Sequence, residues 1–390
     1  MSQAGFVPFA LPDIGEEEIE AVVEAMRSGW LTTGPRAAAF EEEFAAALGG
    51  GVTAIAVNSA TAGLHLALDA CGIGRGDEVL VPDWTFTATA EVVRYLDAEP
   101  VIVDVDPVRL NIDYAAAERA VTPRTKAVMP VHFAGFPVDR EATAQFAARH
   151  GLKVVEDAAH AFPARSRGEL IGQGTSEAVV FSFYATKTMT TGEGGMVVVR
   201  DPEMAGRTRT MRLHGINRDV FARYRSTAPS WFYEVVEAGY KYNLTDPAAA
   251  MGRVQLARSE AMWKARRALA TRYREAFADL PVECPAEPGL DGEPDGTQHA
   301  WHVFATRLHE DAPLGRDDFI ERMAEAGVGC SVHFIPLHRH PYYRDRYGLT
   351  PGEYPVAERE FGRVVSLPLF SSMNEEQREK VVDAVRSVLS

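Results

Sequence analysis

Short apolar runs alternate with helical patterns between about residue 20 and residue 260, and this alternation limits the possible folds more than any other feature. Several runs are almost wholly apolar, as expected for strands that are covered on both faces. Helical spacing separates them, for example in Thr61–Cys71, where Leu64, Leu68 and Cys71 share one face. The pattern predicts an α/β fold with a mainly parallel sheet and helices on both faces. The expected strands are Thr53–Val57, Glu78–Val81, Pro100–Val105, Lys126–Val131, Lys153–Glu156, Ala178–Phe183 and Gly195–Val199.

The pattern changes after about residue 245, where a long helical stretch begins. From this change we predict a large domain over residues 1–260, including an N-terminal arm, and a smaller α+β domain over residues 261–390. The stretch His214–Tyr242 is rich in aromatic residues and Arg, and we interpret it as an excursion over the surface or across a partner subunit. The expected C-terminal elements are a helix over Asp246–Leu280, a loop over Glu283–Thr297, a strand over His302–Leu308, a helix over Arg316–Ala326, a strand over Val328–Ile335 and a helix over Asn374–Leu389, with Asn374 as its N-cap.

Charge and cysteine content exclude several classes of protein. Forty Lys and Arg residues against fifty-five Asp and Glu residues leave a net charge of −15, which disfavours nucleic acid and anionic membranes as partners. The three cysteines form no CxxC pair, which argues against a disulfide framework and suits a reducing compartment. The N-terminal segment lacks the basic and apolar parts of a signal peptide, and no apolar run reaches the ~20 residues of a membrane helix. We therefore expect a cytoplasmic protein.

The segment Phe181–Met196 (FSFYATKTMTTGEGGM) places Lys187 in a loop rich in Thr and Gly between two expected strands. A lysine held at the C-terminal edge of a sheet can form a Schiff base when its pKa is lowered. The surrounding hydroxyl groups and backbone amides suit a phosphate group. Taken alone, such a lysine is more often an exposed loop residue.

A second segment, Val154–Ala161 (VVEDAAHA), places two acids at the end of an expected strand, where α/β enzymes position ligand-binding residues. Asp157 has the chemistry to pair with a protonated ring nitrogen, and His160 to contact the same ring. The alternative is that Asp157 is a structural acid that caps the next helix.

Two further segments complete the pattern. Asn58–Leu68 opens an amphipathic helix with small polar residues, which indicates either an anion site or an ordinary N-cap. In Val81–Thr87, Trp84 follows a strand and is either a plate for a flat cofactor or a core residue. An amine, an acid, a phosphate cradle and an aromatic plate are together the parts that pyridoxal phosphate requires.

The ordered motifs FSFYATK, TTGEGG and EDAAHA resemble the nucleotide-sugar aminotransferase family, the DegT-like branch of the fold-type-I pyridoxal-phosphate enzymes. The resemblance runs from GWLTTGP at residues 29–35 to VHFIPLHRHPYY at residues 332–343, and it implies an aspartate aminotransferase-like fold with a seven-stranded sheet. It implies that Lys187 carries the Schiff base, that Asp157 holds the pyridinium proton and that His160 lies against the cofactor. The other implied roles are ring stacking by Trp84, phosphate binding by Ser59, Ala60, Thr61 and Ser182 and by Asn243 from the neighbouring subunit, and substrate binding by Thr32, Thr33, Tyr184, Lys241, His333 and His338.

This resemblance implies transamination of a dTDP- or UDP-linked 4-keto-6-deoxyhexose or 4-keto-pentose, with L-glutamate as amino donor and a homodimer with active sites at its interface. The alternatives are a 3-keto-sugar aminotransferase of the same family and a non-catalytic regulator on the same scaffold. A nicotinamide enzyme is disfavoured, because the glycines of GIGRGD (residues 72–77) follow a helix and lack the GxGxxG spacing. A metal is not expected, because no nearby acid or cysteine has the spacing to complete a zinc site with His333, His338 and His340.

Overall fold

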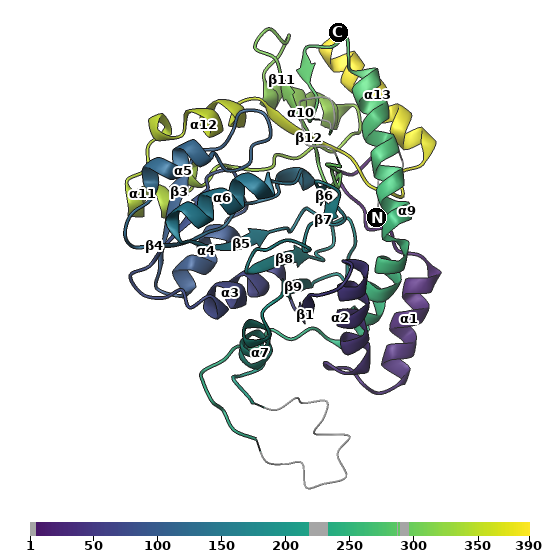
Figure 1. Cartoon of the computed structure of the whole chain (residues 1–390). Helices are drawn as coiled ribbons and strands as arrows, with labels where there is room; N and C mark the ends of the chain where they lie inside the picture. Colours follow the sequence, from purple (N-terminus) through teal and green to yellow (C-terminus); the bar gives the residue numbers. More distant parts are fainter. Residues whose placement is uncertain (1–4, 218–232, 287, 289–295) are drawn as a thin grey trace.

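The computed structural model describes residues 5–217, 233–286, 288 and 296–390. Within these residues, seven strands form one sheet in the order β1-β9-β8-β5-β4-β2-β3 (Figure 1). β9 runs antiparallel to both neighbours, and the other pairs are parallel, so the predicted mainly parallel sheet is confirmed. Its strands are β1 Thr53–Val57, β2 Glu78–Pro82, β3 Glu99–Val103, β4 Thr125–Val128, β5 Lys153–Asp157, β8 Ala178–Ser182 and β9 Gly195–Val199, and a separate hairpin pairs β6 Arg165–Ser166 with β7 Glu169–Leu170.

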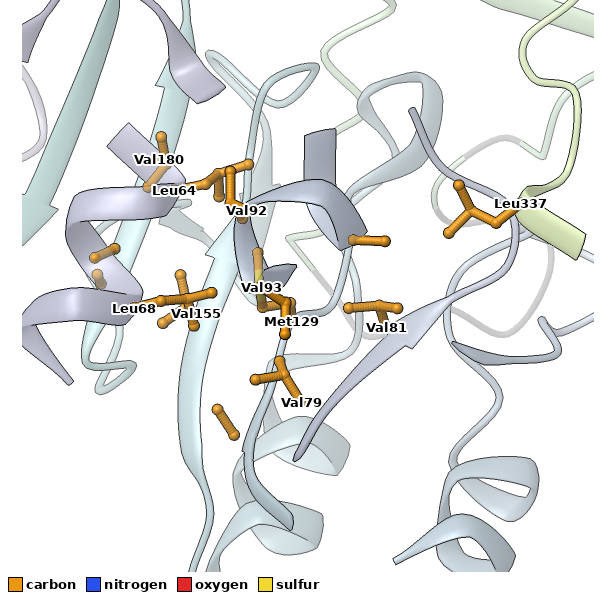
Figure 2. Packing of buried hydrophobic residues seen from close by; sticks show 14 of the residues in the cluster. Leu64, Leu68, Val79, Val81, Val92, Val93, Met129, Val155, Val180 and Leu337 are labelled. Carbon is orange, nitrogen blue, oxygen red and sulfur yellow. The ribbon is translucent and has the colours of Figure 1, made fainter. Parts of the chain in front are cut away.

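Helices cover both faces of this sheet, because successive strand residues enter opposite cores. In β8, for example, Val180 belongs to the core under α3, whereas Val179 and Phe181 belong to the core under α2. Figure 2 shows Leu64 of α3 and Val92 of α4 in the first of these cores, together with Val155 of β5. This double coverage explains why the strands read as continuous apolar runs. The helices of this part of the chain are α1 Glu16–Arg27, α2 Pro35–Ala47, α3 Ala60–Ala70, α4 Ala88–Tyr95, α5 Tyr114–Ala120, α6 Arg140–His150 and α7 Pro202–Met211.

The C-terminal part packs around a three-stranded sheet and one end of a long helix, α9 (Figure 1). α9 spans Asp246–Ala276, and its residue Met262 packs in a core of the large sheet, whereas Leu269 and Tyr273 pack in the C-terminal core. The predicted boundary at residue 260 therefore falls inside one continuous helix, and the division into two domains stays a prediction. The remaining elements are β10 Val282–Glu283, β11 Phe304–Leu308, α10 Arg316–Glu325, α11 Pro341–Tyr347, α12 Pro355–Phe361, β12 Val364–Leu367 and α13 Glu375–Leu389, whose N-cap is Asn374 as predicted.

One predicted strand is wrong. Val328–Ile335 forms only isolated bridges, between Val328 and Val7 and between Ser331 and Ser366, and no continuous ladder. The backbone hydrogen bonds of Val7 with Gly327 and Gly329 also place the N-terminal arm against the C-terminal part of the chain. Most of the expected excursion over His214–Tyr242 and of the expected loop over Glu283–Thr297 lies outside the described residues.

Candidate active site

A cavity of about 480 Å³ lies at the edge of the large sheet where the parallel strands β2, β5 and β8 end. Ligands of open α/β sheets bind at this edge, because the loops that follow the carboxyl ends of the strands converge there. The cavity walls contain nine of the residues predicted from the sequence, namely Ser59, Ala60, Thr61, Asp157, His160, Ser182, Tyr184, Lys187 and His333.

Lys187 lies in the loop that follows β8. Its backbone N–H donates to the carbonyl of Tyr184 at 2.9 Å, and the hydroxyl of Thr188 donates to the carbonyl of Phe162 at 2.6 Å, so the loop is fixed on both sides of the lysine. Burial lowers the pKa of Lys187 to about 8, and the negative charge of Asp157 opposes this shift. About a tenth of this amine is therefore neutral, and hence nucleophilic, at pH 7, which is far more than for a lysine of ordinary pKa.

Asp157 ends β5 with its carboxylate in the cavity wall. Its Oδ2 accepts a hydrogen bond from the Thr89 hydroxyl at 2.8 Å, and its Oδ1 accepts one from the Ala159 backbone N–H at 3.1 Å. Because the Thr89 proton points to the carboxylate, the 2.7 Å contact between Thr85 and Thr89 must have Thr85 as donor. Burial raises the pKa of Asp157, against these two hydrogen bonds and the charge of Lys187. A cation bound in the cavity would favour its ionised form.

His160 is buried in the same wall and carries an unused polar atom. Within the described part of the chain, its Nδ1 has no hydrogen-bond partner. The ring lies 4.4 Å from the ring of His302 and stacks on Phe334 at 5.7 Å. Burial, together with the charge of Lys187, lowers the pKa of His160 well below its usual range, so the imidazole is neutral. It is thus available to exchange a hydrogen bond with a ligand.

The N-terminus of α3 forms another part of the wall. The Ser59 hydroxyl accepts from the Ala62 backbone N–H at 3.1 Å, which makes Ser59 the N-cap. The two amides before Ala62 belong to Ala60 and Thr61, and the first amides of a helix have no acceptor within it and attract anions. β9 approaches closely here, because a Cβ on Gly195 would lie 2.8 Å from the Ala60 nitrogen. An anion-binding helix end, an amine, a buried carboxylate and an unpaired imidazole nitrogen in one cavity fit pyridoxal phosphate.

Trp84 is not where the sequence analysis expected it. Its side chain is 0% exposed, packs edge-on against Phe133 at 6.1 Å and does not belong to the cavity walls. Phe86 lines the cavity instead and is 59% exposed. The structure thus contradicts a place for Trp84 in the cavity wall, where Phe86 stands instead, and aromatic stacking on the cofactor stays a prediction. The sequence shows two aromatic residues after β2, but only the path of the turn decides which of them faces the cavity.

His338 is likewise absent from the cavity walls. It is 1% exposed in its side chain, and its ring nitrogens pair with Asp83 at 2.6 Å and with Glu358 at 3.1 Å. The expectation that His338 lines the substrate cleft is corrected, because these two carboxylates hold its ring behind the wall.

Thr32, Thr33, Lys241 and Asn243 lie outside the cavity walls of their own chain. Asn243 bridges Val57 of the edge strand β1, and its side-chain N–H donates to the Thr33 hydroxyl at 2.7 Å. The amine of Lys241 donates to the side-chain oxygen of Asn243, and the Thr32 carbonyl accepts from the Asp246 backbone N–H at 3.2 Å. The predicted roles of these four residues are untested by this arrangement and stay predictions.

The sequence analysis missed several residues of the cavity. Thr85 lines the cavity, and Thr89 supports it by bonding Asp157; their spacing of four residues around the start of α4 was a signal that the two hydroxyl groups lie together. Phe334 had no such signal, because it reaches the cavity from a segment far away in the chain.

Comparison with known proteins gives a consistent result. The DegT/DnrJ/EryC1/StrS aminotransferase family matches residues 12–386 of this chain. The spore coat polysaccharide biosynthesis protein SpsC from Bacillus subtilis is 45% identical over 386 residues, which cover 98% of this chain and 97% of SpsC. The PMP-form of Spr1654 from Streptococcus pneumoniae, a proposed sugar aminotransferase also solved in a PLP-form, matches with a TM-score of 0.90 and 31% identity over 98% of both chains. PseC from Helicobacter pylori, an aminotransferase involved in the biosynthesis of pseudoaminic acid, matches with a TM-score of 0.89 and 27% identity, covering 98% of this chain and 99% of PseC.

Proposed function

Since this chain belongs to the DegT/DnrJ/EryC1/StrS aminotransferase family, we propose that it transfers an amino group from L-glutamate to the C4 ketone of a nucleotide-linked sugar, either a 6-deoxyhexose or a pentose on dTDP or UDP. Its membership makes it a fold-type-I sugar aminotransferase that depends on pyridoxal phosphate. The observation that carries the proposal is the meeting of Lys187, Asp157 and the N-terminus of α3 in one cavity.

The residues of the cavity would hold the cofactor by its charged groups. The amides of Ala60 and Thr61, with Ser59 and Ser182, would bind the phosphate. Asp157, held by Thr89 and Ala159, would keep a proton on the ring nitrogen. When bound, pyridoxal phosphate draws electrons into its ring and so stabilises negative charge on the carbon that loses a proton.

Lys187 would perform the proton transfers. Its amine, with a pKa lowered to about 8, is close enough to neutral pH to accept a proton from the amino donor and to return one during turnover. His160, neutral and with a free Nδ1, would contact the ring oxygen of the cofactor. Tyr184 and His333, which also line the cavity, are the proposed substrate contacts.

The proposal includes a homodimer whose active sites lie at the interface. The negatively charged diphosphate of a nucleotide sugar calls for cations, yet among the described wall residues Lys187 is the only Lys or Arg. Lys241 and Asn243 stand together at the edge of the sheet and outside their own cavity, so they are suited to reach the phosphate groups in a second copy.

The compartment is also part of the proposal. The three cysteines are free thiols, which suits a reducing cytoplasm. Among the helices of the described residues, none has the length and apolar character required to cross a membrane.

The first experiment is an absorption spectrum of the purified protein before and after addition of L-glutamate. Conversion of the pyridoxal phosphate band to the pyridoxamine phosphate form supports glutamate as donor, and subsequent addition of single dTDP- or UDP-keto sugars should restore the band only with the true acceptor. Lys187→Arg should bind the cofactor and show neither change. Restoration by a 3-keto sugar alone would refute the C4 assignment, and a cofactor-loaded protein that responds to no amino donor would indicate a regulator.

Shared active sites are tested by mixing two weakened variants, Lys187→Ala and Asn243→Ala. A heterodimer of the two holds one site in which Lys187 from one copy meets Asn243 from the other. Random reassociation of equal amounts should therefore restore about a quarter of the wild-type sites. If mixing restores no activity although subunits exchange, the two residues do not meet across an interface.

A further inference from the structure

Two segments that are far apart in the chain meet in the wall of the cavity. One follows β2 and contributes Thr85 and Phe86, and the other precedes α11 and contributes His333 and Phe334. The rings of Phe86 and Phe334 lie 6.2 Å apart. The relative position of the two segments therefore decides where the flat face of Phe86 stands in the cavity.

A buried junction joins these segments directly behind the wall. The carboxylate of Asp83 accepts the backbone N–H of His338 at 2.8 Å through Oδ1 and pairs with its ring Nδ1 at 2.6 Å through Oδ2. The Asp83 carbonyl accepts the Leu337 backbone N–H at 3.0 Å. Asp83 and His338 are 0% and 1% exposed, so water does not compete for these bonds.

The His338 ring is held at both nitrogens and on one face. Its Nε2 pairs with Glu358 of α12 at 3.1 Å, and its face stacks on Tyr354 with centroids 4.9 Å apart and planes 10° apart. Because both ring nitrogens and one face are engaged, the ring cannot turn without breaking several contacts. The C-terminal part of the chain thus presents a fixed donor to Asp83.

On the other side, Asp83 begins the segment that reaches the reacting groups. Two residues after Asp83, the Thr85 hydroxyl donates to Thr89, and Thr89 donates to the Asp157 carboxylate. Phe86, on the cavity wall, lies between Thr85 and Thr89. Any shift of Asp83 therefore moves both the ring of Phe86 and the hydrogen bond from Thr89 that orients Asp157.

We propose that His338 is a positioning residue for transamination, acting through Asp83 to place Phe86 and the Thr85–Thr89–Asp157 hydrogen-bond chain against the cofactor. This inference rests on the proposed role of Asp157 and takes Phe86 as the ring that stacks on the cofactor, and it does not depend on which keto sugar is the acceptor. It gives the C-terminal motif that contains His338 a function other than substrate contact.

The test compares two replacements of His338 in the holoenzyme. In His338→Asn the amide nitrogen can stand near the position of Nδ1 and keep the bond to Asp83, whereas in His338→Gln it stands near Nε2 and loses that bond. Asp83→Asn is a milder variant, because the asparagine side chain keeps the shape of aspartate and an oxygen that accepts the backbone N–H of His338. Glu78→Gln is the matched control, because buried Glu78 lies at the opposite end of β2 from Asp83, bonds Thr122 and Thr125, and does not line the cavity.

The readouts are the circular dichroism of the bound cofactor band, the rate of the half-reaction with glutamate and the midpoint of thermal unfolding. His338→Gln should lower the half-reaction rate by about tenfold or more and weaken the dichroic band, because small displacements of reacting groups have large rate effects. His338→Asn should recover most of both, and Asp83→Asn should resemble His338→Gln more weakly. Glu78→Gln should lower only the midpoint.

Two outcomes would overturn the proposal. Equal loss of thermal stability in all four variants, with unchanged dichroism and rate, would make the junction merely structural. A His338→Asn variant as slow as His338→Gln, at similar stability, would show that the bond to Asp83 is not the one that matters. Failure of the wild-type protein to react with glutamate would instead refute the proposed donor, while the dichroism of the bound cofactor would still test the junction.

Discussion

Replacing Lys187 by Met should stabilise the cofactor-free protein at neutral pH. Burial lowers the pKa of Lys187 from its ordinary value of 10.5 to about 8. A difference of roughly 2.5 pKa units corresponds to about 3 kcal/mol of unfolding free energy, at 1.36 kcal/mol per unit. Partial exposure of the side chain makes this an upper value. Met keeps a similar apolar stem and removes the charge, so the expected gain is ~2–3 kcal/mol at pH 7.

The pH dependence gives this prediction its sign. Because the pKa of Lys187 is lower in the folded protein, the unfolded chain binds more protons between pH 8 and about 10.5. The wild-type stability therefore rises with pH in that window, relative to a variant without the amine. The advantage of Lys187→Met should be full below pH 8, fall to about half near pH 9 and vanish above about pH 10.5.

Urea unfolding of the cofactor-free protein at pH 7, 8 and 9, at one protein concentration, measures this difference. Asp157→Asn is the control. The charge of Lys187 lowers the pKa of Asp157, so Lys187→Met alone leaves the buried Asp157 carboxylate without that favourable charge and makes it less stable. The double variant Lys187→Met with Asp157→Asn should thus exceed the sum of the single effects. A Lys187→Met protein less stable than wild type at pH 7, or an advantage equal at pH 7 and pH 9, would refute the reasoning.

Three further predictions concern the cavity. Thr89→Val removes the donor to Asp157 at constant shape and should weaken pyridoxal phosphate binding by about tenfold, as measured by titration of the apoprotein, whereas Thr143→Val, at a buried threonine of α6 outside the cavity walls, should not. Gly195→Ala places a Cβ 2.8 Å from the Ala60 nitrogen and should weaken binding of pyridoxal phosphate more than that of pyridoxal, which lacks the phosphate; equal weakening of both would contradict the anion site at α3. Phe86→Leu should reduce the dichroism of the bound cofactor without loss of fold, whereas Trp84→Phe should lower the thermal midpoint and leave the dichroism unchanged; the opposite pattern would restore Trp84 as the stacking residue.

Much of the large sheet is predictable from local pattern. The expected bounds of the strands Thr53–Val57 and Gly195–Val199 agree with the structure, because buried parallel and mixed sheets demand continuous apolar runs. The expected strand Pro100–Val105 ends earlier, at Val103, since the Asp104 side chain turns to bond the start of α12. The apolar pattern of the sequence does not show at which residue a strand ends and the next side chain bonds the start of a helix instead.

The convergence of Lys187, Asp157 and Ser59 on one cavity was predictable for a topological reason. Strands β5 and β8 are parallel neighbours, so the residues that follow them meet at the same edge of the sheet. Because β9 is antiparallel to both β8 and β1, β1 runs in the same direction as β8, and Ser59, which follows β1, reaches that edge too. Motif and strand position together therefore locate the candidate site, while the role of each residue stays a proposal until it is tested.

The sequence by itself determined the α/β class, the strands of the large sheet and the side chains that gather at its edge, because these depend on periodicity and on residues close together in the chain. Only the tertiary structure decided that Phe86 and not Trp84 faces the cavity, and that His338 lies behind the wall. These outcomes depend on contacts such as that between Asp83 and His338, which are 255 residues apart. No local pattern encodes a contact of that range, because it exists only once the two parts of the chain have packed together.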